Sequence, residues 1–318
     1  MDFNSYKPTG KISNKHMLTL MDYSSEEIFE ILKTAVDLKA KQYAHIPHDY
    51  LVGKTLAMIF AKSSTRTRIS FEQGIKQLGG SPLFLSTNDI QLGRGEPIKD
   101  TVRVLERMNI DGIMIRTFHQ SDLDELAKWG HIPIINGLTD EFHPCQVLAD
   151  LLTVYEKFGK FDKLKLTFFG DGFNMANSLM LGCAKVGMDV CICTPKGFEP
   201  SPAVIKAAMG SALNGSKVTI TNNVNEAISG ADVVYTDVFF SMGQPKDEAK
   251  VKAMMPMQVN AAMMKKANKG AIFLHCLPAH RDEEVTDEVM ESPQSWIFQE
   301  AENRLHAQKA VIYLLMRD

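Results

Sequence analysis

The sequence predicts an α/β protein of two domains, each a parallel sheet flanked by helices, with an active site in the cleft between them. Three observations support this prediction. Short apolar runs of strand length alternate with segments of helical periodicity along almost the whole chain. The alternation occurs in two series, and one long helical segment, about 145–158, joins them. Apolar runs of this kind are typical of parallel strands, because helices cover both faces of their sheet.

The first series begins with a helix after Ser24, since Ser24 and Glu27 have the spacing of a capping box. Pro97 suits the first turn of a later helix, which we expect to run to Met108. The pattern predicts strands at 55–61, 81–86, 111–116 and 133–138, and further helices that end at 79–80 and cover 121–129.

The second series predicts strands at 164–170, 189–194, 217–221, 232–236 and 271–277, and a final helix at 302–316. Residues 241–256 show no periodicity and are rich in Gly, Pro, Met and charge, so we expect a long loop of the kind that is often functional. The predicted first domain contains residues 1–150, with the helix 302–318 packing back on it. The second contains residues 151–301.

Composition limits the classes of partner. The chain has 318 residues, a formal net charge of −3 and 45% hydrophobic residues, which gives no general reason to expect nucleic acid or a membrane surface. No stretch approaches the roughly 20 apolar residues of a membrane span, and the first 20 residues lack the apolar run of a secretory signal. Five scattered cysteines do not indicate a disulfide framework, so we expect a cytoplasmic protein.

A cluster of hydroxyls and guanidiniums, Ser64-Thr65-Arg66-Thr67-Arg68, follows the strand at 55–61 and opens a helix. Free backbone N–H groups and the helix dipole favour an anion at such a turn, and arginine suits phosphate because its planar fork bonds two oxygens. A well-capped helix with surface arginines would show the same pattern, so both interpretations stay open. The lack of a glycine-rich loop argues against a nucleotide P-loop.

His143-Pro144-Cys145-Gln146 stands at the start of the joining helix. Pro144 suits the first turn and places His143 at the cap. A helix N-terminus lowers the pKa of an imidazole, so His143 is a candidate neutral donor to a carbonyl group. A simple capping histidine is the alternative interpretation.

Three further motifs stand at the ends of strands in the second series, where open α/β sheets bind ligands. Gly170 to Asn174 lacks the three-glycine spacing of a dinucleotide fingerprint, which argues against NAD. Asp237 suits a ligand ammonium, although a cap or a solvated loop carboxylate is the alternative. Cys276, in His275-Cys276-Leu277-Pro278, is either functional or a small buried apolar residue. The Cys191/Cys193 pair shares one strand face, but without a second pair it is a weak candidate for a metal site.

Taken together, these residues resemble the ornithine carbamoyltransferase family, and the resemblance spans residues 64 to 304. The matching motifs, in the family's order, are Ser64 to Arg68, Gln91-Leu92-Gly93-Arg94-Gly95-Glu96, Arg116, His143 to Gln146, Asp171 to Asn174, Asp237 with Ser241-Met242-Gly243, His275 to Pro278, and Asn303-Arg304. The first and fourth are shared by carbamoyltransferases in general, whereas Ser241-Met242-Gly243 and His275 to Pro278 are signatures of the ornithine branch. Phe173 departs from the family, whose members often have a polar residue there.

The resemblance implies that the chain transfers the carbamoyl group of carbamoyl phosphate to the side-chain amine of L-ornithine, giving L-citrulline and phosphate. It implies a carbamoyl-phosphate-binding first domain, an ornithine-binding second domain, and a homotrimer in which Gln91 enters the neighbouring subunit's site. No metal or organic cofactor is needed. Putrescine, aspartate or an acylated ornithine as the acceptor, a dinucleotide-dependent dehydrogenase, and a non-catalytic subunit are the alternatives.

The resemblance also assigns the site residues. Those implied for carbamoyl phosphate are Ser64, Thr65, Arg66, Thr67, Gln91, Arg116, His143, Gln146, Cys276, Leu277 and Arg304. Those implied for ornithine are Asn174, Asp237, Ser241 and Met242. Arg116, His143, Asp237, Cys276 and Arg304 are the expected catalytic residues. Whether the reaction serves arginine synthesis or citrulline breakdown stays open.

Overall fold

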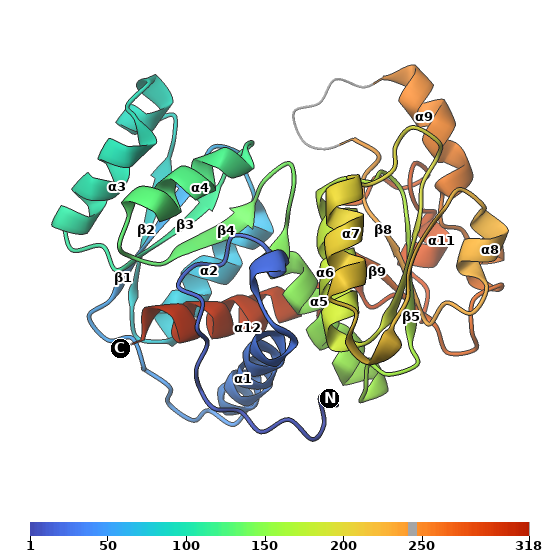
Figure 1. Ribbon diagram of the computed structural model, residues 1–318, viewed down its shortest axis with the longest axis horizontal. Coiled ribbons are helices and arrows are strands. Elements are labelled where there is room, and N and C mark those ends of the chain that lie inside the picture. Colours follow the sequence, from blue (N-terminus) through green and yellow to red (C-terminus); the bar gives the residue numbers. More distant parts are fainter. Residues whose placement is uncertain (241–246, 318) are drawn as a thin grey trace. The chain divides into compact units, whose positions relative to one another are not determined.

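The computed structural model describes residues 1–240 and 247–317. It divides the chain into two compact units (Figure 1). The β1–β4 unit contains Lys7–Leu152 and Asn303–Asp318, and the β5–β9 unit contains Met1–Tyr6 and Thr153–Glu302. The first six residues therefore pack with the β5–β9 unit, and the final helix contributes residues to both units.

The β1–β4 unit contains a parallel four-stranded sheet in the order β2-β1-β3-β4. Its strands are β1 (Thr55–Phe60), β2 (Ser81–Ser86), β3 (Gly112–Arg116) and β4 (Ile134–Leu138). Its helices are η1 (Leu20–Asp22), α1 (Ser25–Tyr43), α2 (Thr65–Gln77), η2 (Gln91–Arg94), α3 (Ile98–Arg107), α4 (Gln120–Trp129) and most of α5 (Pro144–Phe158). The predicted capping box of α1 is confirmed, because Ser24 and Glu27 exchange both cap hydrogen bonds.

Alternate residues of β1 and β3 pack on opposite faces of this sheet. Ala57, Ile59 and Ile113 face a cluster that includes Val102 of α3 and Leu123 of α4. On the other face, the final helix approaches the sheet so closely that a Cβ on Gly112 would meet the Met316 sulfur at 3.0 Å.

The β5–β9 unit contains a parallel five-stranded sheet in the order β7-β6-β5-β8-β9. Its strands are β5 (Lys165–Phe169), β6 (Asp189–Cys193), β7 (Val218–Thr221), β8 (Val233–Thr236) and β9 (Ile272–His275). Its helices are α6 (Asn174–Val186), α7 (Pro202–Gly210), η3 (Leu213–Gly215), α8 (Val224–Ile228), α9 (Glu248–Met254), η4 (Met255–Met257), α10 (Ala261–Met264), α11 (Asp287–Met290) and the start of α12 (Ile297–Met316).

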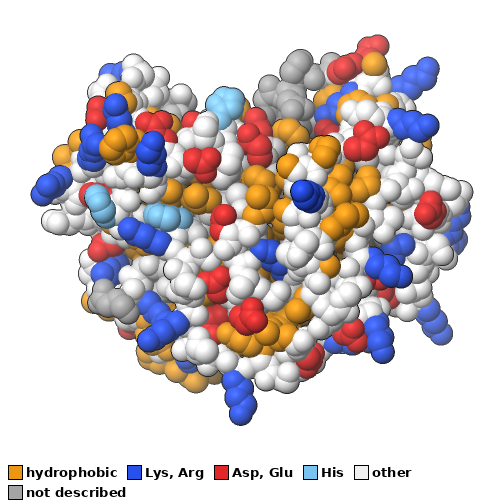
Figure 2. All heavy atoms as spheres, in the orientation of Figure 1, with side chains coloured by type: hydrophobic (Ala, Val, Ile, Leu, Met, Phe, Trp, Pro, Cys, Tyr) orange, Lys and Arg blue, Asp and Glu red, His pale blue; other side chains and the backbone are white. Residues whose placement is uncertain are grey.

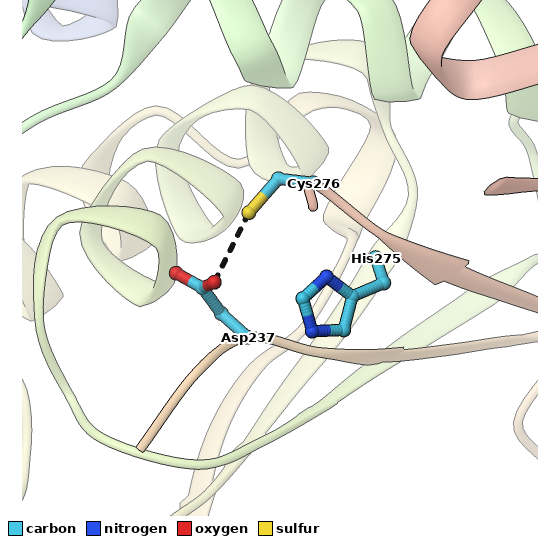
Figure 3. A group of neighbouring side chains, drawn as sticks. All are labelled: Asp237, His275 and Cys276. Carbon is cyan, nitrogen blue, oxygen red and sulfur yellow. Dashed lines mark hydrogen bonds between the residues drawn. The ribbon is translucent and has the colours of Figure 1, made fainter. Parts of the chain in front are cut away.

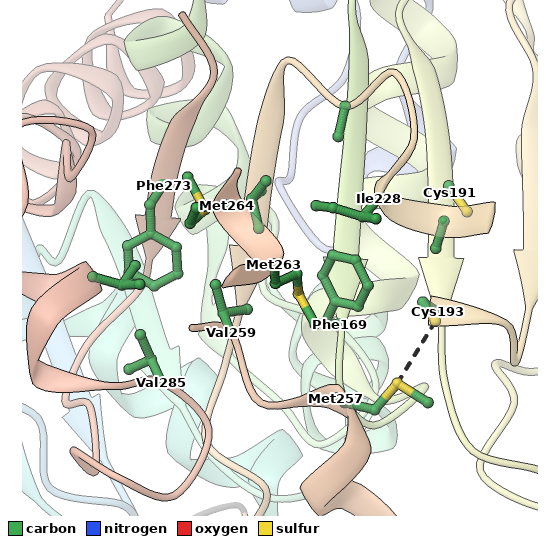
Figure 4. Packing of buried hydrophobic residues seen from close by; sticks show 14 of the residues in the cluster. Phe169, Cys191, Cys193, Ile228, Met257, Val259, Met263, Met264, Phe273 and Val285 are labelled. Atoms are coloured by element: carbon green, nitrogen blue, oxygen red, sulfur yellow. Dashed lines mark hydrogen bonds between the residues drawn. The ribbon is translucent and has the colours of Figure 1, made fainter. Parts of the chain in front are cut away.

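One face of the second sheet packs against α8 to α11 through a core rich in methionine and phenylalanine (Figure 4). Cys191 and Cys193 lie in this core, and the Cys193 thiol contacts the Met257 sulfur at 3.6 Å. These two residues therefore act as small apolar side chains of the strand. The predicted two-domain α/β fold is confirmed, and within the described residues no helix has the length and apolar character of a membrane span.

Two predicted elements were wrong. Residues 248–257 are helical rather than part of a long loop, because the Asp247 side chain caps α9 by accepting the N–H of Ala249. The final helix begins at Ile297 rather than near Glu302. Its first turn was missed because Phe298 is 69% exposed and breaks the apolar periodicity. Residues 241–246 lie outside the described part of the chain.

Charges of both signs alternate over the face drawn in Figure 2, in keeping with the small net charge of the chain.

Candidate active site

The hydroxyl and guanidinium cluster lies at the N-terminus of α2, at the turn that follows β1. Ser64 is the N-cap, and its hydroxyl accepts the N–H of Thr67 at 3.3 Å. A pocket of about 480 Å³ opens here, lined by residues from the carboxyl ends of β1 and β2 and from the start of α2, including Ser63, Ser64 and Thr65. The predicted strand-to-helix turn is confirmed, and it presents hydroxyls at the positive end of a helix.

Arg304 of α12 is buried and connects this turn to α5. Its guanidinium donates to the Thr67 hydroxyl at 3.0 Å and to the Gln146 side-chain oxygen at 2.5 Å. With its amide oxygen turned toward the guanidinium, Gln308 accepts from Arg304 Nε and Nη2 at 2.8 and 2.7 Å. These three partners are uncharged side chains that orient the guanidinium of Arg304.

Arg116 and His143 belong to the same unit as this cluster. Arg116 ends β3 and is 7% exposed, and His143 precedes α5 and is 4% exposed. Burial, followed by the positive charges of Arg304, Arg116 and Arg66, holds the pKa of His143 well below its usual range. The ring is therefore neutral at pH 7, as a donor to a carbonyl oxygen requires. From the sequence we expected the helix N-terminus to lower the pKa of His143, whereas burial is the larger cause.

Two predicted anion ligands are more accessible. Thr65 is exposed and Arg66 is half-buried at the start of α2. Gln91 is exposed in η2, and it is not among the residues that line the pocket beside Ser64.

In the β5–β9 unit, Asp237 and Cys276 come together at the carboxyl ends of adjacent strands (Figure 3). The Cys276 thiol donates to Asp237 Oδ1 at 3.1 Å, and the same oxygen accepts the N–H of Val238 at 2.7 Å. The parallel register, which pairs Thr236 with His275, places the next residue of each strand side by side. One oxygen of the carboxylate is thus held both by the backbone N–H of the next residue and by the thiol.

Asn174 begins α6, and it lines one small pocket together with Asp237, Asp171 and Phe173. The structure therefore brings the predicted Asn174 and Asp237 together, and it places the unusual Phe173 beside them. Ser241 and Met242 lie outside the described residues.

Two lysines near these sites, Lys250 and Lys62, were not predicted from the sequence. Lys250 of α9 forms a 2.6 Å ion pair with Asp171, and buried Lys62, just after β1, pairs with Asp140. Lys62 could have been noticed, since a lysine directly after a buried strand is a signal of the same kind as Asp237. Lys250 lay in the segment that was predicted to be a loop.

Within the described residues, two groups have the proximity of metal ligands: Asp237 with His275 and Cys276, and His280 with Glu283 and Glu284. Both ring nitrogens of His275 are already hydrogen-bonded, one to the Leu277 N–H and one to Glu284. The first group is therefore a poor metal site.

The two parallel sheets, each with polar side chains at the carboxyl ends of its strands, define a two-domain α/β protein with candidate ligand sites at those sheet edges. Two family models match the chain: the carbamoyl-phosphate-binding domain of aspartate/ornithine carbamoyltransferases over residues 15–156, and the Asp/Orn-binding domain over residues 162–315. The chain belongs to the aspartate/ornithine carbamoyltransferase family.

The relatives point to one branch of this family. The ornithine carbamoyltransferase of Anoxybacillus flavithermus is 54% identical over 97% of this chain and 98% of its own length. That of Bacillus subtilis is 54% identical over 95% and 94%. The solved ornithine carbamoyltransferase from Pyrococcus furiosus superposes with a TM-score of 0.93 at 49% identity, over 96% of this chain and 98% of that one.

Proposed function

We propose that the protein transfers the carbamoyl group of carbamoyl phosphate to the side-chain amine of L-ornithine, releasing L-citrulline and phosphate. The observation that carries this proposal is the assembly of Thr67, Arg304 and Gln146 in the same unit as a histidine that burial, and then three arginines, keep neutral. Such a site suits a dianion joined to a carbonyl group. The names and near-complete coverage of the relatives support ornithine as the acceptor.

On the phosphate side, the helix N-terminus at Ser64 to Thr67 and the charge of Arg66 hold the phosphoryl oxygens. Arg116, His143 and Arg304 donate to the carbonyl oxygen as it becomes an oxyanion in the tetrahedral intermediate. The phosphate then leaves while the same cations still hold it. Gln146 acts by fixing Arg304, as their 2.5 Å contact supports.

On the amine side, Asp237 pairs with the α-ammonium of ornithine, and Asn174 binds its α-carboxylate. Ser241 and Met242 complete this site on the strength of their motif alone. The side-chain amine is then directed at the carbonyl carbon, where positioning supplies much of the rate. Cys276 contacts Asp237 and keeps the amine nucleophile oriented. The backbone polar groups of Cys276 and Leu277 bind the carbamoyl group.

Citrulline formation from carbamoyl phosphate and ornithine tests this function. The Arg66→Ala variant should raise the KM for carbamoyl phosphate and lower kcat/KM by roughly 10²–10³, the usual loss for one such donor. Arg103→Ala, on the exposed side of α3, is the matched control and should behave like the wild type. Normal turnover by Arg66→Ala would move the phosphate site away from α2.

We also propose that the active unit is a homotrimer in which Gln91 completes the neighbouring subunit's site. The exposure of Gln91 supports this proposal. Arg66→Ala and Gln91→Ala proteins should each be weak enzymes, and mixed trimers should regain activity because some sites then contain both native residues. Absence of recovery, in subunits shown to exchange, would place Gln91 in its own subunit's site. The cytoplasm is the proposed compartment, because the structure joins none of the five cysteines in a disulfide.

A further inference from the structure

His275 is fully buried at the end of β9, and the hydrogen bonds to its ring define its tautomer. The N–H of Leu277 donates to His275 Nδ1 at 2.8 Å, so this nitrogen carries no proton. The proton of the neutral ring is therefore on Nε2, which lies 3.2 Å from Glu284 Oε1 and donates to it. The ring thus connects a buried carboxylate to the backbone that immediately follows Cys276.

Two buried glutamates hold His275 from different directions. Glu284 Oε1 accepts from the ring and also from the backbone N–H of His280 at 2.5 Å. Glu300, at the start of α12, accepts the backbone N–H of His275 at 2.8 Å and the Tyr235 hydroxyl at 3.0 Å. Since β9 is an edge strand, no further strand in the described part of the chain accepts the backbone N–H of His275, and the Glu300 carboxylate supplies this acceptor instead. Burying two carboxylates is costly, so a packing role alone accounts poorly for both.

The backbone that His275 restrains is strained. Leu277 has a φ of +56°, a left-handed conformation that is unfavourable for a residue other than glycine. Such a conformation persists only where its surroundings enforce it. The hydrogen bond from Leu277 to the imidazole ring is one such restraint, and Cys276, which contacts Asp237, lies between the two bonded residues.

We propose that His275, fixed by Glu284 and Glu300, is a positioning residue that holds Cys276 and Leu277 in the conformation that binds substrate. The inference rests on the proposed function, because it gives a task to the backbone that carries Cys276. The essential contact is the one between Nδ1 and the Leu277 N–H. Glu284 acts through the ring, by keeping the proton on Nε2 and Nδ1 free to accept.

Two substitutions of His275 separate this role from simple packing. Asparagine can place its side-chain oxygen near the position of Nδ1 and so keep the acceptor for Leu277. Glutamine reaches toward Glu284 but leaves Leu277 without its acceptor. We expect His275→Asn to retain kcat within about tenfold, and His275→Gln to lose about 10²-fold in kcat, with smaller changes in KM, as for a reacting group displaced by about 1 Å.

A second pair of variants covers the case in which His275→Gln does not fold. Glu284→Gln keeps an oxygen that accepts from the ring, and should stay within about tenfold of the wild-type kcat. Glu284→Leu removes that acceptor and should match the loss expected for His275→Gln. Val259→Ala, in the buried core of the same unit, is a control for lost stability without lost positioning.

Alkylation of Cys276 by iodoacetamide, read by peptide mass spectrometry without substrate, tests positioning independently of catalysis. Cys276 is half-buried, whereas the other four cysteines are buried. We expect the rate of Cys276 alkylation to change several-fold in His275→Gln and Glu284→Leu. It should not change in His275→Asn, Glu284→Gln or Val259→Ala. The proposal would be overturned if the two His275 variants had the same kcat and alkylation rate, and the two Glu284 variants likewise. It would also be overturned if kcat followed thermal stability in all variants. A wild type without carbamoyl transfer would contradict the proposed function, and the alkylation rates would still decide the role of His275.

Discussion

Arg304 is a buried cation whose guanidinium is oriented by uncharged side chains. The hydroxyl of Thr67 and the amides of Gln146 and Gln308 accept from its guanidinium, and all three are uncharged. Carboxylates in these places would orient the arginine equally well but would neutralise it. Acceptors without charge therefore suit a site that is proposed to hold a dianion.

The Asp237→Asn substitution separates the amine from the phosphate. It keeps the size and one acceptor oxygen but removes the charge that is proposed to pair with the α-ammonium. We expect kcat/KM for ornithine to fall by about 10²-fold, since a charged partner is left unpaired, while the affinity for carbamoyl phosphate, measured by calorimetry, is unchanged. Unaltered ornithine kinetics would place the amine elsewhere.

His143 makes stability depend on pH. Its folded-state pKa lies below the ordinary value of 6.5, so the unfolded chain takes up the proton first as the pH falls. The stabilisation is therefore complete above about pH 6.5 and is lost below it, by at most about 1.4 kcal/mol per pH unit. In urea unfolding between pH 7 and 5, His143→Gln should lose stability less steeply than the wild type.

A matched control for this prediction is His119→Gln, since His119 is exposed and forms no side-chain cap bond at α4. It should reproduce the wild-type slope. The same slope for His143→Gln as for the wild type would mean that His143 is protonated in the folded protein.

At the scale of elements, the caps of α1 and α2 use the same residue for different purposes. Ser24 and Ser64 both accept an N–H in the first turn of their helix. We expect Ser24→Ala and Ser64→Ala each to lower the free energy of unfolding by about 1 kcal/mol. Only Ser64→Ala should also weaken the binding of carbamoyl phosphate, which can be measured as a higher KM for this substrate. Equal kinetic effects of the two substitutions would argue that the α2 turn is structural.

Elements with regular periodicity and clear caps could be predicted from the sequence. Strands such as β1 and β8 and the helix after Ser24 are examples, because these strands are buried and largely apolar, and because Ser24 and Glu27 form a local signal. The start of α12 and all of α9 could not be predicted. Phe298 is exposed on α12, and the helix after Asp247 follows a segment rich in glycine and proline, so local pattern and tertiary structure disagree there.

The candidate site was predictable only in part, for a related reason. Motifs at strand ends indicated Ser64, Asp237 and Cys276, because parallel strands place such residues along one edge of a sheet. The contacts of Arg304 with Gln146 and of His275 with Glu284 and Glu300 join residues from separate elements. No local pattern encodes these pairings. The assignments of Ser241 and Met242 remain predictions, since both lie outside the described residues.

At the scale of the whole molecule, each of the two units contains candidate site residues among those that the structure describes. The β1–β4 unit has the groups proposed for carbamoyl phosphate, and the β5–β9 unit has most of those proposed for ornithine. This division implies that substrate choice can be tested one half at a time. We expect substitutions that change the carbamoyl acceptor to fall in the β5–β9 unit, where Phe173 lines the pocket that also contains Asn174 and Asp237.

The most direct test of the central claim is the rate of carbamoyl transfer from carbamoyl phosphate to a panel of amines: ornithine, putrescine, aspartate and N-acetylornithine. We expect a high kcat/KM with ornithine and little product with the others, because Asp237 is proposed to pair with the α-ammonium, which putrescine lacks and acetylation removes, and because aspartate has no side-chain amine. A preference for another amine would retain the phosphate half of the account and contradict the amine half, with Phe173 the first residue to replace. No transfer to any of the four, by folded protein, would contradict the proposed function itself.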